Sequence, residues 1–146
     1  MFESSRRWIA KVSDFSHSLL DTGEEKYLPG GTIPYNAPEW REKLTTKKMF
    51  KTDVYSYGIL LGCVLVGFDW AQKFVSNLEH GATKEEREEY LLREKQTDRF
   101  RSHVIDLLYD RVDREDLNAT KAVLEHTLQS NPDKRDLQQV ITLLSM

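Results

Sequence analysis

This 146-residue sequence has a single cysteine and no excess of basic over acidic residues. Cys63 is the only cysteine, so an internal disulfide and a metal site built from several thiolates are excluded. Because Cys63 lies inside an apolar run, we expect a buried, unreactive thiol in a reducing compartment. The formal net charge is −3, whereas a protein that binds nucleic acid electrostatically carries a basic face or tail. The composition therefore predicts no nucleic-acid partner.

A secretory signal and a membrane-spanning run are lacking as well. Met1 to Trp8 carries charges but no apolar core, and the acidic residues Glu3 and Asp14 argue against a transit peptide. The longest apolar stretch, from Gly58 to Phe68, is only eleven residues long, and a helix needs about 20 residues to cross a bilayer. We therefore expect a cytoplasmic or nuclear protein with no membrane partner.

The sequence does contain one strongly apolar segment, from Asp53 to Phe68, which we expect at the centre of the core. Between Ile59 and Val66 only Gly62 interrupts the apolar side chains, so no polar stripe marks a solvent-facing side. This pattern predicts a helix that is buried on all sides, with Thr52 as its N-cap. Asp53 is then an unusual carboxylate at the edge of a hydrophobic core.

Few regular elements are expected before this helix. Residues 8–15 begin with strand-like alternation, which predicts one short strand. Residues 16–39 include three of the four prolines of the chain, which predicts a long irregular connection, and such loops are usually functional or mobile. Pro38 to Lys43 has a proline and an acidic residue in its first turn, which favours a short helix.

The residues after the central helix are predicted to be helical. Residues 79–101 carry acidic and basic residues in near balance, which favours a solvated helix. Apolar residues recur at helical spacing over residues 104–112 and again over residues 119–128, which predicts two half-buried helices. Residues 137–144 show the clearest amphipathic pattern. Because no internal repeat or linker is visible, we expect one mainly α domain.

Four short motifs follow one another along the chain. Residues 13–16 read S-D-F-S, residues 31–39 read G-T-I-P-Y-N-A-P-E, residues 53–58 read D-V-Y-S-Y-G, and residues 131–135 read N-P-D-K-R. In this order they resemble the carboxyl-terminal lobe of protein kinases, from the D-F-G motif to the last helix, with an activation segment more similar to Ser/Thr than to tyrosine kinases. The resemblance implies that residues 1–146 form a partial protein kinase-like domain. Its fold would be a mainly α bundle around a buried central helix, with at most one or two short strands at the amino terminus.

The resemblance implies a metal-binding role for Asp14. In the family this carboxylate bridges Mg²⁺ to the nucleotide phosphates, and the alternative is a turn aspartate that caps a backbone amide. Phe15 would pack inward beside it. Ser16 stands where the family has glycine, which should restrict changes in the position of Phe15.

Three hydroxyl residues fall in the segment that resembles the activation segment. Ser18, Thr22 and Thr32 are candidates for phosphorylation, because an added phosphate orders a loop when arginines receive it. For Thr22 an ordinary solvated hydroxyl is an equally open interpretation. Thr32 also matches the position that orients the substrate in the family.

Three further residues receive structural roles from the resemblance. Glu39 and Arg135 match a buried ion pair that ties the activation segment to the carboxyl-terminal helices. Asp53 matches an aspartate that anchors the catalytic loop. Since no such loop occurs in this sequence, we expect Asp53 to lack its main donors and to have a raised pKa.

Phosphoryl transfer in this family needs a Gly-rich loop, a strand lysine paired with a glutamate, and an H-R-D catalytic loop, all of which precede the D-F-G motif. None occurs in the thirteen residues before Asp14. ATP and Mg²⁺ are therefore implied for the family, whereas we expect this chain to bind neither and to be catalytically incompetent by itself. Three explanations stay open: a partial Ser/Thr kinase domain without its amino-terminal lobe, a non-catalytic pseudokinase module that binds a protein partner, or a helical adaptor with coincidental motifs.

Overall fold

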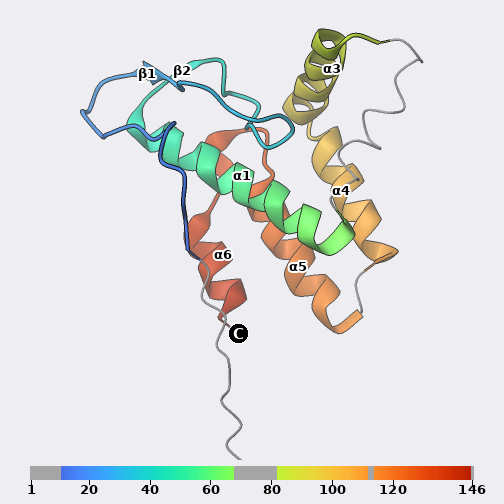
Figure 1. Ribbon diagram of the computed structural model, residues 1–146. Helices are drawn as coiled ribbons and strands as arrows, with labels where there is room; N and C mark the ends of the chain where they lie inside the picture. Colours follow the sequence, from blue (N-terminus) through green and yellow to red (C-terminus); the bar gives the residue numbers. More distant parts are fainter. Residues whose placement is uncertain (1–10, 68–81, 112–113, 146) are drawn as a thin grey trace, which may run out of the picture.

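The computed structural model describes residues 11–67, 82–111 and 114–145 (Figure 1). Two-residue strands, β1 (Lys26–Tyr27) and β2 (Lys43–Leu44), pair antiparallel with Lys26 opposite Leu44. The helices are α1 (Thr46–Val66), α3 (Lys84–Gln96), α4 (Arg99–Tyr109), α5 (Arg114–Thr127) and α6 (Leu137–Leu144), with a 3₁₀ turn at Pro132–Lys134. The mainly α fold with short strands near the amino terminus is confirmed.

Helix α1 runs through the middle of the molecule, with α5 and α6 on one side of it and α3 and the two strands on the other (Figure 1). Tyr55, Ile59 and Cys63 follow one another at four-residue spacing along α1 and are fully buried. They belong to one apolar cluster with side chains of α4, of α5 and of the residue that follows α5, namely Phe100, Val104, Leu108, Leu124 and Leu128. Burial of this stripe places α1 at the centre of the core.

Glycine allows the close approach of α1 and α5. A Cβ at Gly58 would lie 2.3 Å from Thr127 Oγ1 and 2.8 Å from Leu128 Cδ2. These distances are well inside van der Waals contact, so only a residue without a side chain fits here. Thr127 is itself buried, and its hydroxyl donates to the carbonyl of Val123 at 2.9 Å.

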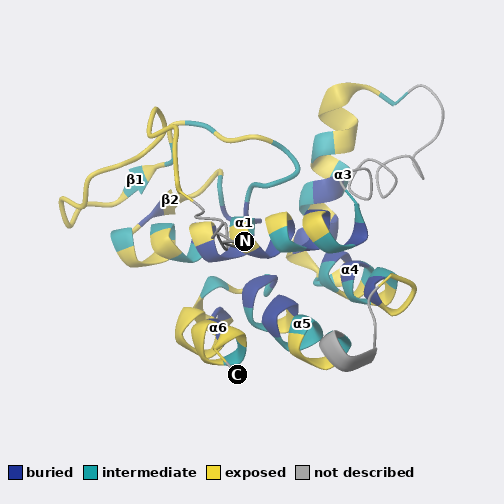
Figure 2. Cartoon of the chain, turned by 60° about the horizontal axis from the view of Figure 1, so that its bottom comes forward, coloured by how far each residue is buried: buried dark blue, intermediate teal, exposed yellow. Residues whose placement is uncertain are grey.

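The prediction that the central helix is buried on all sides is wrong. Leu60 and Val64 are 48% and 63% exposed, and Phe50 and Tyr57 are exposed as well. Figure 2 shows exposed residues recurring along α1. These four residues form what we call the α1 open face. The apolar sequence has no polar stripe because it encodes two apolar faces, of which the described helices cover only one.

The start of α1 also differs from the prediction. The N-cap is Thr45, whose hydroxyl oxygen accepts a hydrogen bond from the Lys48 amide at 3.4 Å. Thr52 lies inside the helix, buried, and donates to the carbonyl of Met49 at 2.7 Å. The first two turns of α1 carry three lysines, at 47, 48 and 51, and this polar composition hid them from a search for apolar periodicity.

By length and composition, α1 passes the test for a membrane-spanning helix. The core helix of a soluble protein passes the same test, and eight α1 residues are buried within the fold. The burial against α4 and α5 is what a core helix shows.

Two predicted elements ahead of α1 are absent from the described residues. Residues 11–15 form no strand, and residues 8–10 of that prediction lie outside the described residues. Residues 38–42 form consecutive turns in place of a short helix, with the Trp40 amide bonded to the Ala37 carbonyl at 3.2 Å and the Glu42 amide to the Glu39 carbonyl at 2.8 Å. The following strand β2 pairs with β1, so the chain must leave the helical path at residue 43.

The single helix predicted over residues 79–101 is two helices, α3 and the start of α4, within the described residues 82–101, and residues 79–81 of that prediction lie outside the described residues. Helix α3 begins at a capping box made by Thr83 and Glu86. The break lies at Asp98, whose φ of 59° is left-handed and ends the helical path. Helix α5 starts at Arg114, before the predicted stretch of residues 119–128. Helix α6 was predicted, and within it only Val140 is buried.

Candidate functional site

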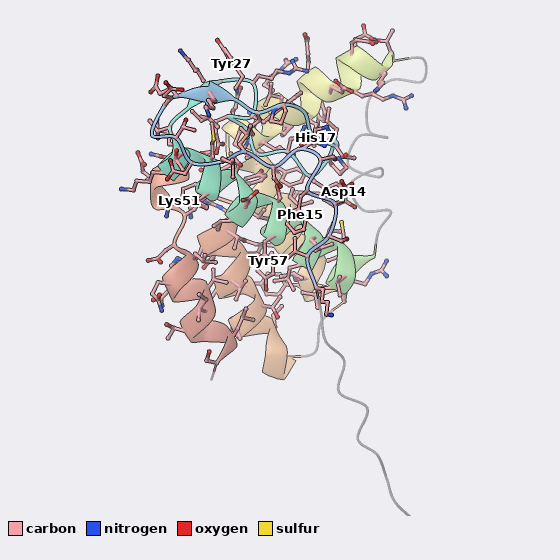
Figure 3. The ribbon with its side chains drawn as sticks, turned by 60° about the vertical axis from the view of Figure 1, so that its left-hand side comes forward. Asp14, Phe15, His17, Tyr27, Lys51 and Tyr57 are labelled. Atoms are coloured by element: carbon pink, nitrogen blue, oxygen red, sulfur yellow. The ribbon has the colours of Figure 1, made fainter. Side chains whose placement is uncertain are left out.

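The predicted site residues lie mainly on the segment that precedes α1 and crosses it. Figure 3 labels Asp14, Phe15 and His17 on this segment, and Lys51 and Tyr57 on α1. A cavity of about 210 Å³ lies between the segment and the first half of α1, lined by residues of both, among them His17, Leu20, Asp21, Phe50 and Asp53. This cavity is the candidate site.

Asp14 is exposed and forms a local turn. Its φ is 63°, and its Oδ1 accepts hydrogen bonds from the Ser16 hydroxyl at 2.7 Å and from the Ser16 amide at 3.3 Å. The Ser16 hydroxyl, followed by the Ser16 amide, lowers the pKa of the Asp14 carboxyl. This geometry is that of the capping turn, the second of the two interpretations of Asp14.

The described residues do not build a magnesium site by themselves. No group of three His, Cys, Asp or Glu side chains that could hold a metal occurs within residues 11–67, 82–111 and 114–145. Asp14 offers a single carboxylate, with one oxygen already engaged by Ser16. Mg²⁺ in phosphoryl-transfer sites is held by one or two carboxylates together with substrate phosphates, so other groups would have to complete the site.

Phe15 does not pack inward, contrary to the expectation. Its side chain is 68% exposed. Phe15 instead contributes its carbonyl, which accepts a hydrogen bond from the Ser18 amide at 3.1 Å. Most of the aromatic residue is therefore in contact with solvent.

Ser18, Thr22 and Thr32 are all exposed. The carbonyl of Thr32 accepts from the Tyr35 amide at 2.8 Å. Residues 21–23 are attached to the start of α1 by Asp21, a residue that no sequence pattern marked. Asp21 Oδ1 accepts from the Thr46 hydroxyl at 2.7 Å and from the Gly23 amide at 2.9 Å, and these two donors lower its pKa.

Glu39 and Arg135, ninety-six residues apart, form a buried pair. The guanidinium donates from Nη1 to Oε1 at 2.5 Å and from Nη2 to Oε2 at 2.8 Å, in the bidentate geometry that makes such pairs strong. The guanidinium also donates to three backbone carbonyls, those of Gln129, Lys51 and Ser130. In return, Lys51 Nζ donates to the carbonyl of Arg135. The pair thus ties the 38–42 turns and the first half of α1 to the chain that leaves α5.

Asp53 lies at the edge of the candidate site, on the side of α1 that carries the α1 open face. The residue is exposed. No described residue donates a hydrogen bond to it, and partial removal from water raises its pKa. The direction of the pKa shift is the predicted one, although its carboxylate retains access to solvent.

Lys95 is a further functional candidate that the sequence analysis missed. It is 3% exposed and reaches from the end of α3 to the loop of residues 33–37, where it bonds the carbonyls of Pro34 and Asn36. In the sequence it is one of six basic residues in a charge-balanced stretch, so nothing marks it as buried.

Comparison with known proteins identifies the family. The chain is 32% identical over 139 residues to the LRR receptor-like serine/threonine-protein kinase FEI 2 of Arabidopsis thaliana, a match covering 92% of this chain and 22% of that protein. A probable receptor-like protein kinase of the same plant is 31% identical over 145 residues, covering 92% of this chain and 31% of its own. The chain belongs to the protein kinase superfamily.

A third kinase matches a shorter region. Human receptor-interacting serine/threonine-protein kinase 3 is 39% identical over 61 residues, which covers 39% of this kinase chain and 12% of the human protein. The chain thus spans between 12% and 31% of the length of these three relatives. No protein-family model matches the kinase chain, and no solved structure matches it.

Proposed function

We propose that this chain is the carboxyl-terminal part of a Ser/Thr protein kinase domain, and that by itself it transfers no phosphate. The relatives are named as kinases, two of them as serine/threonine kinases. Their family uses ATP and Mg²⁺. The observation that carries the proposal is the α1 open face together with the neighbouring carboxylate of Asp53, to which no described residue donates a hydrogen bond.

The α1 open face has the spacing of a helix that packs against a second layer. Phe50, Tyr57, Leu60 and Val64 stand at i, i+7, i+10 and i+14, so they project from one side of α1. A contiguous apolar surface of this kind normally marks an interaction site. Asp53 supplies an acceptor at one end of it, which a donor on the covering segment would satisfy. A kinase domain assembled on this face would complete the layer that the described residues leave uncovered.

The described residues account for only part of phosphoryl transfer. Catalysis of this reaction is mainly positioning and charge stabilisation by a lysine, metal ligands and a base that accepts the substrate proton. Of these parts, the proposal assigns the metal to Asp14, of which one carboxylate oxygen is engaged by Ser16, and substrate positioning to Thr32, whose carbonyl accepts from the Tyr35 amide. Activating phosphorylation at Ser18, Thr22 or Thr32 belongs to the same proposal, since all three hydroxyl residues are accessible.

The test is phosphate transfer from radiolabelled ATP, with Mg²⁺, to casein by the purified chain, beside the variant Asp14→Asn. We expect no transfer above background from either protein. Transfer by the wild type that Asp14→Asn abolishes would overturn the proposal. Equal transfer by both proteins would identify a contaminating kinase, because the sole candidate metal ligand within the described residues has then been removed without effect.

A non-catalytic interaction module is the second candidate, and the α1 open face is the observation that favours it. A thermal-shift measurement with Mg²⁺ and ATP separates the two, because a ligand that binds only the native state raises its melting temperature. A cooperative transition that ATP does not move favours the interaction module. A shift that Asp14→Asn removes favours a kinase part that retains nucleotide binding.

A further inference from the structure

The loop of residues 33–37 is held to the helices by side chains. Three consecutive carbonyls accept hydrogen bonds from other elements: those of Pro34 and Asn36 from Lys95 Nζ, and that of Tyr35 from the Ser56 hydroxyl at 3.0 Å. Within the loop the Tyr35 amide bonds the Thr32 carbonyl at 2.8 Å. Donors from two helices, Ser56 of α1 and Lys95 of α3, therefore satisfy these backbone carbonyls and fix the path of the loop.

Lys95 is the donor that reaches the loop from α3. Its Nζ lies 2.6 Å from the Asn36 carbonyl, 5.4 Å from the centre of the Tyr55 ring and 5.2 Å from that of Phe100. The two rings belong to α1 and α4, so one buried nitrogen joins the loop to the three helices. Aromatic faces and carbonyl oxygens both attract a cation, while burial opposes its charge.

We propose that Lys95 docks residues 34–36 reversibly on α3. The loop is docked while the Lys95 side chain is buried, and it is released when that side chain turns out to solvent. The inference concerns the conformation of the loop and does not depend on whether the chain belongs to an active kinase. It makes Lys95 a positioning residue, which acts on Thr32 and the surface beside it through the loop backbone.

Release of the loop is linked to pH. Burial lowers the pKa of Lys95 to about 7 from 10.5, and the charge of Glu39 opposes that change. A lysine that has turned out to solvent regains its ordinary pKa, so the released state binds the proton more tightly than the docked state. Docking is therefore weakest below about pH 7 and strengthens as the pH rises above it.

The charges around Lys95 are otherwise paired, so its own titration dominates. Glu39 is neutralised by Arg135, and Glu94 of α3 lies 3.5 Å from Arg99. At the edge of the small cavity beside Lys95, Glu88 lies 3.5 Å from Arg41. The remaining titratable group against it is Tyr55, whose phenol burial keeps neutral by raising its pKa.

The experiment is amide hydrogen exchange of Tyr35, whose amide bonds the Thr32 carbonyl, in the full chain from about pH 6 to about pH 9, with the exchange rate divided by its intrinsic rate. In the wild type, protection should rise above pH 7 by up to about tenfold per pH unit, the limit for one linked proton. In Lys95→Met protection should be lower and independent of pH. Lys95→Arg, which stays charged throughout, should also show no slope.

Lys84→Met is the matched control, because Lys84 is on the same helix and is 84% exposed; it should retain the wild-type slope. A carbon NMR titration of the lysine side chains gives a second readout that needs no variant to fold, with one lysine expected to titrate near pH 7. Wild-type protection that does not change with pH, a slope that survives in Lys95→Met, or lysines that all titrate near their ordinary pKa would each overturn the proposal.

Discussion

Removal of one charge from the buried Glu39–Arg135 pair gives the sharpest test of what holds the fold together. In Glu39→Gln the guanidinium loses its counter-charge, although it keeps an amide oxygen and its backbone acceptors. Breaking a buried pair from one side costs about 3–5 kcal/mol of unfolding free energy, and the remaining acceptors place this variant near the lower end, at about 3 kcal/mol. Arg135→Met should cost more, about 5 kcal/mol. It leaves the Glu39 carboxylate buried without a counter-charge, and it also removes the donor from three carbonyls, those of Gln129, Lys51 and Ser130.

Urea denaturation followed by circular dichroism measures both variants. With a slope of about 2 kcal/mol per molar urea, the midpoints should fall by about 1.5 M for Glu39→Gln and by about 2.5 M for Arg135→Met. The control is Glu125→Gln, which breaks the exposed pair of Lys121 and Glu125 on α5, 3.8 Å apart, and should cost less than about 1 kcal/mol. A Glu39→Gln effect no larger than that of the control, or a smaller effect for Arg135→Met than for Glu39→Gln, would refute the reasoning.

Two further substitutions test α1. Asp53→Asn should be neutral or stabilising at pH 7. The folded-state pKa of Asp53 is raised, so its ionised form lowers the stability of the fold once the pH exceeds that pKa, and the uncharged amide removes this cost. A clearly lowered urea midpoint would show that Asp53 has a donor. Gly58→Ala should destabilise by about 1–3 kcal/mol, because its Cβ would meet Thr127 Oγ1 at 2.3 Å and α1 would have to move from α5. An unchanged melting temperature for Gly58→Ala would mean that the two helices separate without cost.

The existence of α1 could be predicted from the sequence, whereas its exposure could not. An uninterrupted apolar run indicates that every face can be buried, but which faces are buried depends on the elements that cover them. Leu60 and Val64 are as apolar as Ile59 and Cys63, yet the first two are exposed and the last two are buried. The helix begins at Thr46, capped by Thr45, well before the predicted N-cap Thr52. Its first turns are rich in lysine, so they show no apolar periodicity although their backbone is helical.

The site residues divide in the same way. Glu39 and Arg135 were paired from a resemblance, because no local pattern connects residues so far apart in sequence. Lys95 gave no signal, since a buried lysine in a charged helix looks like its solvated neighbours until the loop that covers it is placed. Asp14 and Phe15 were assigned roles that depend on neighbouring groups, and within the described residues the Asp14 carboxylate accepts from Ser16 while Phe15 is mostly exposed.

The segment ahead of α1 therefore has two halves that are held differently. Residues 33–42 are held by side chains from three parts of the chain, namely the half-buried Ser56 of α1 and the buried Lys95 of α3 and Arg135 beyond α5. Residues 11–25 are held by turns within the segment and by one side-chain bond to α1, from the Thr46 hydroxyl to Asp21. Buried bonds in a low dielectric resist opening far more than exposed ones do. The half that carries the ion pair is thus held more firmly by groups of this chain than the half that carries Asp14 and Phe15.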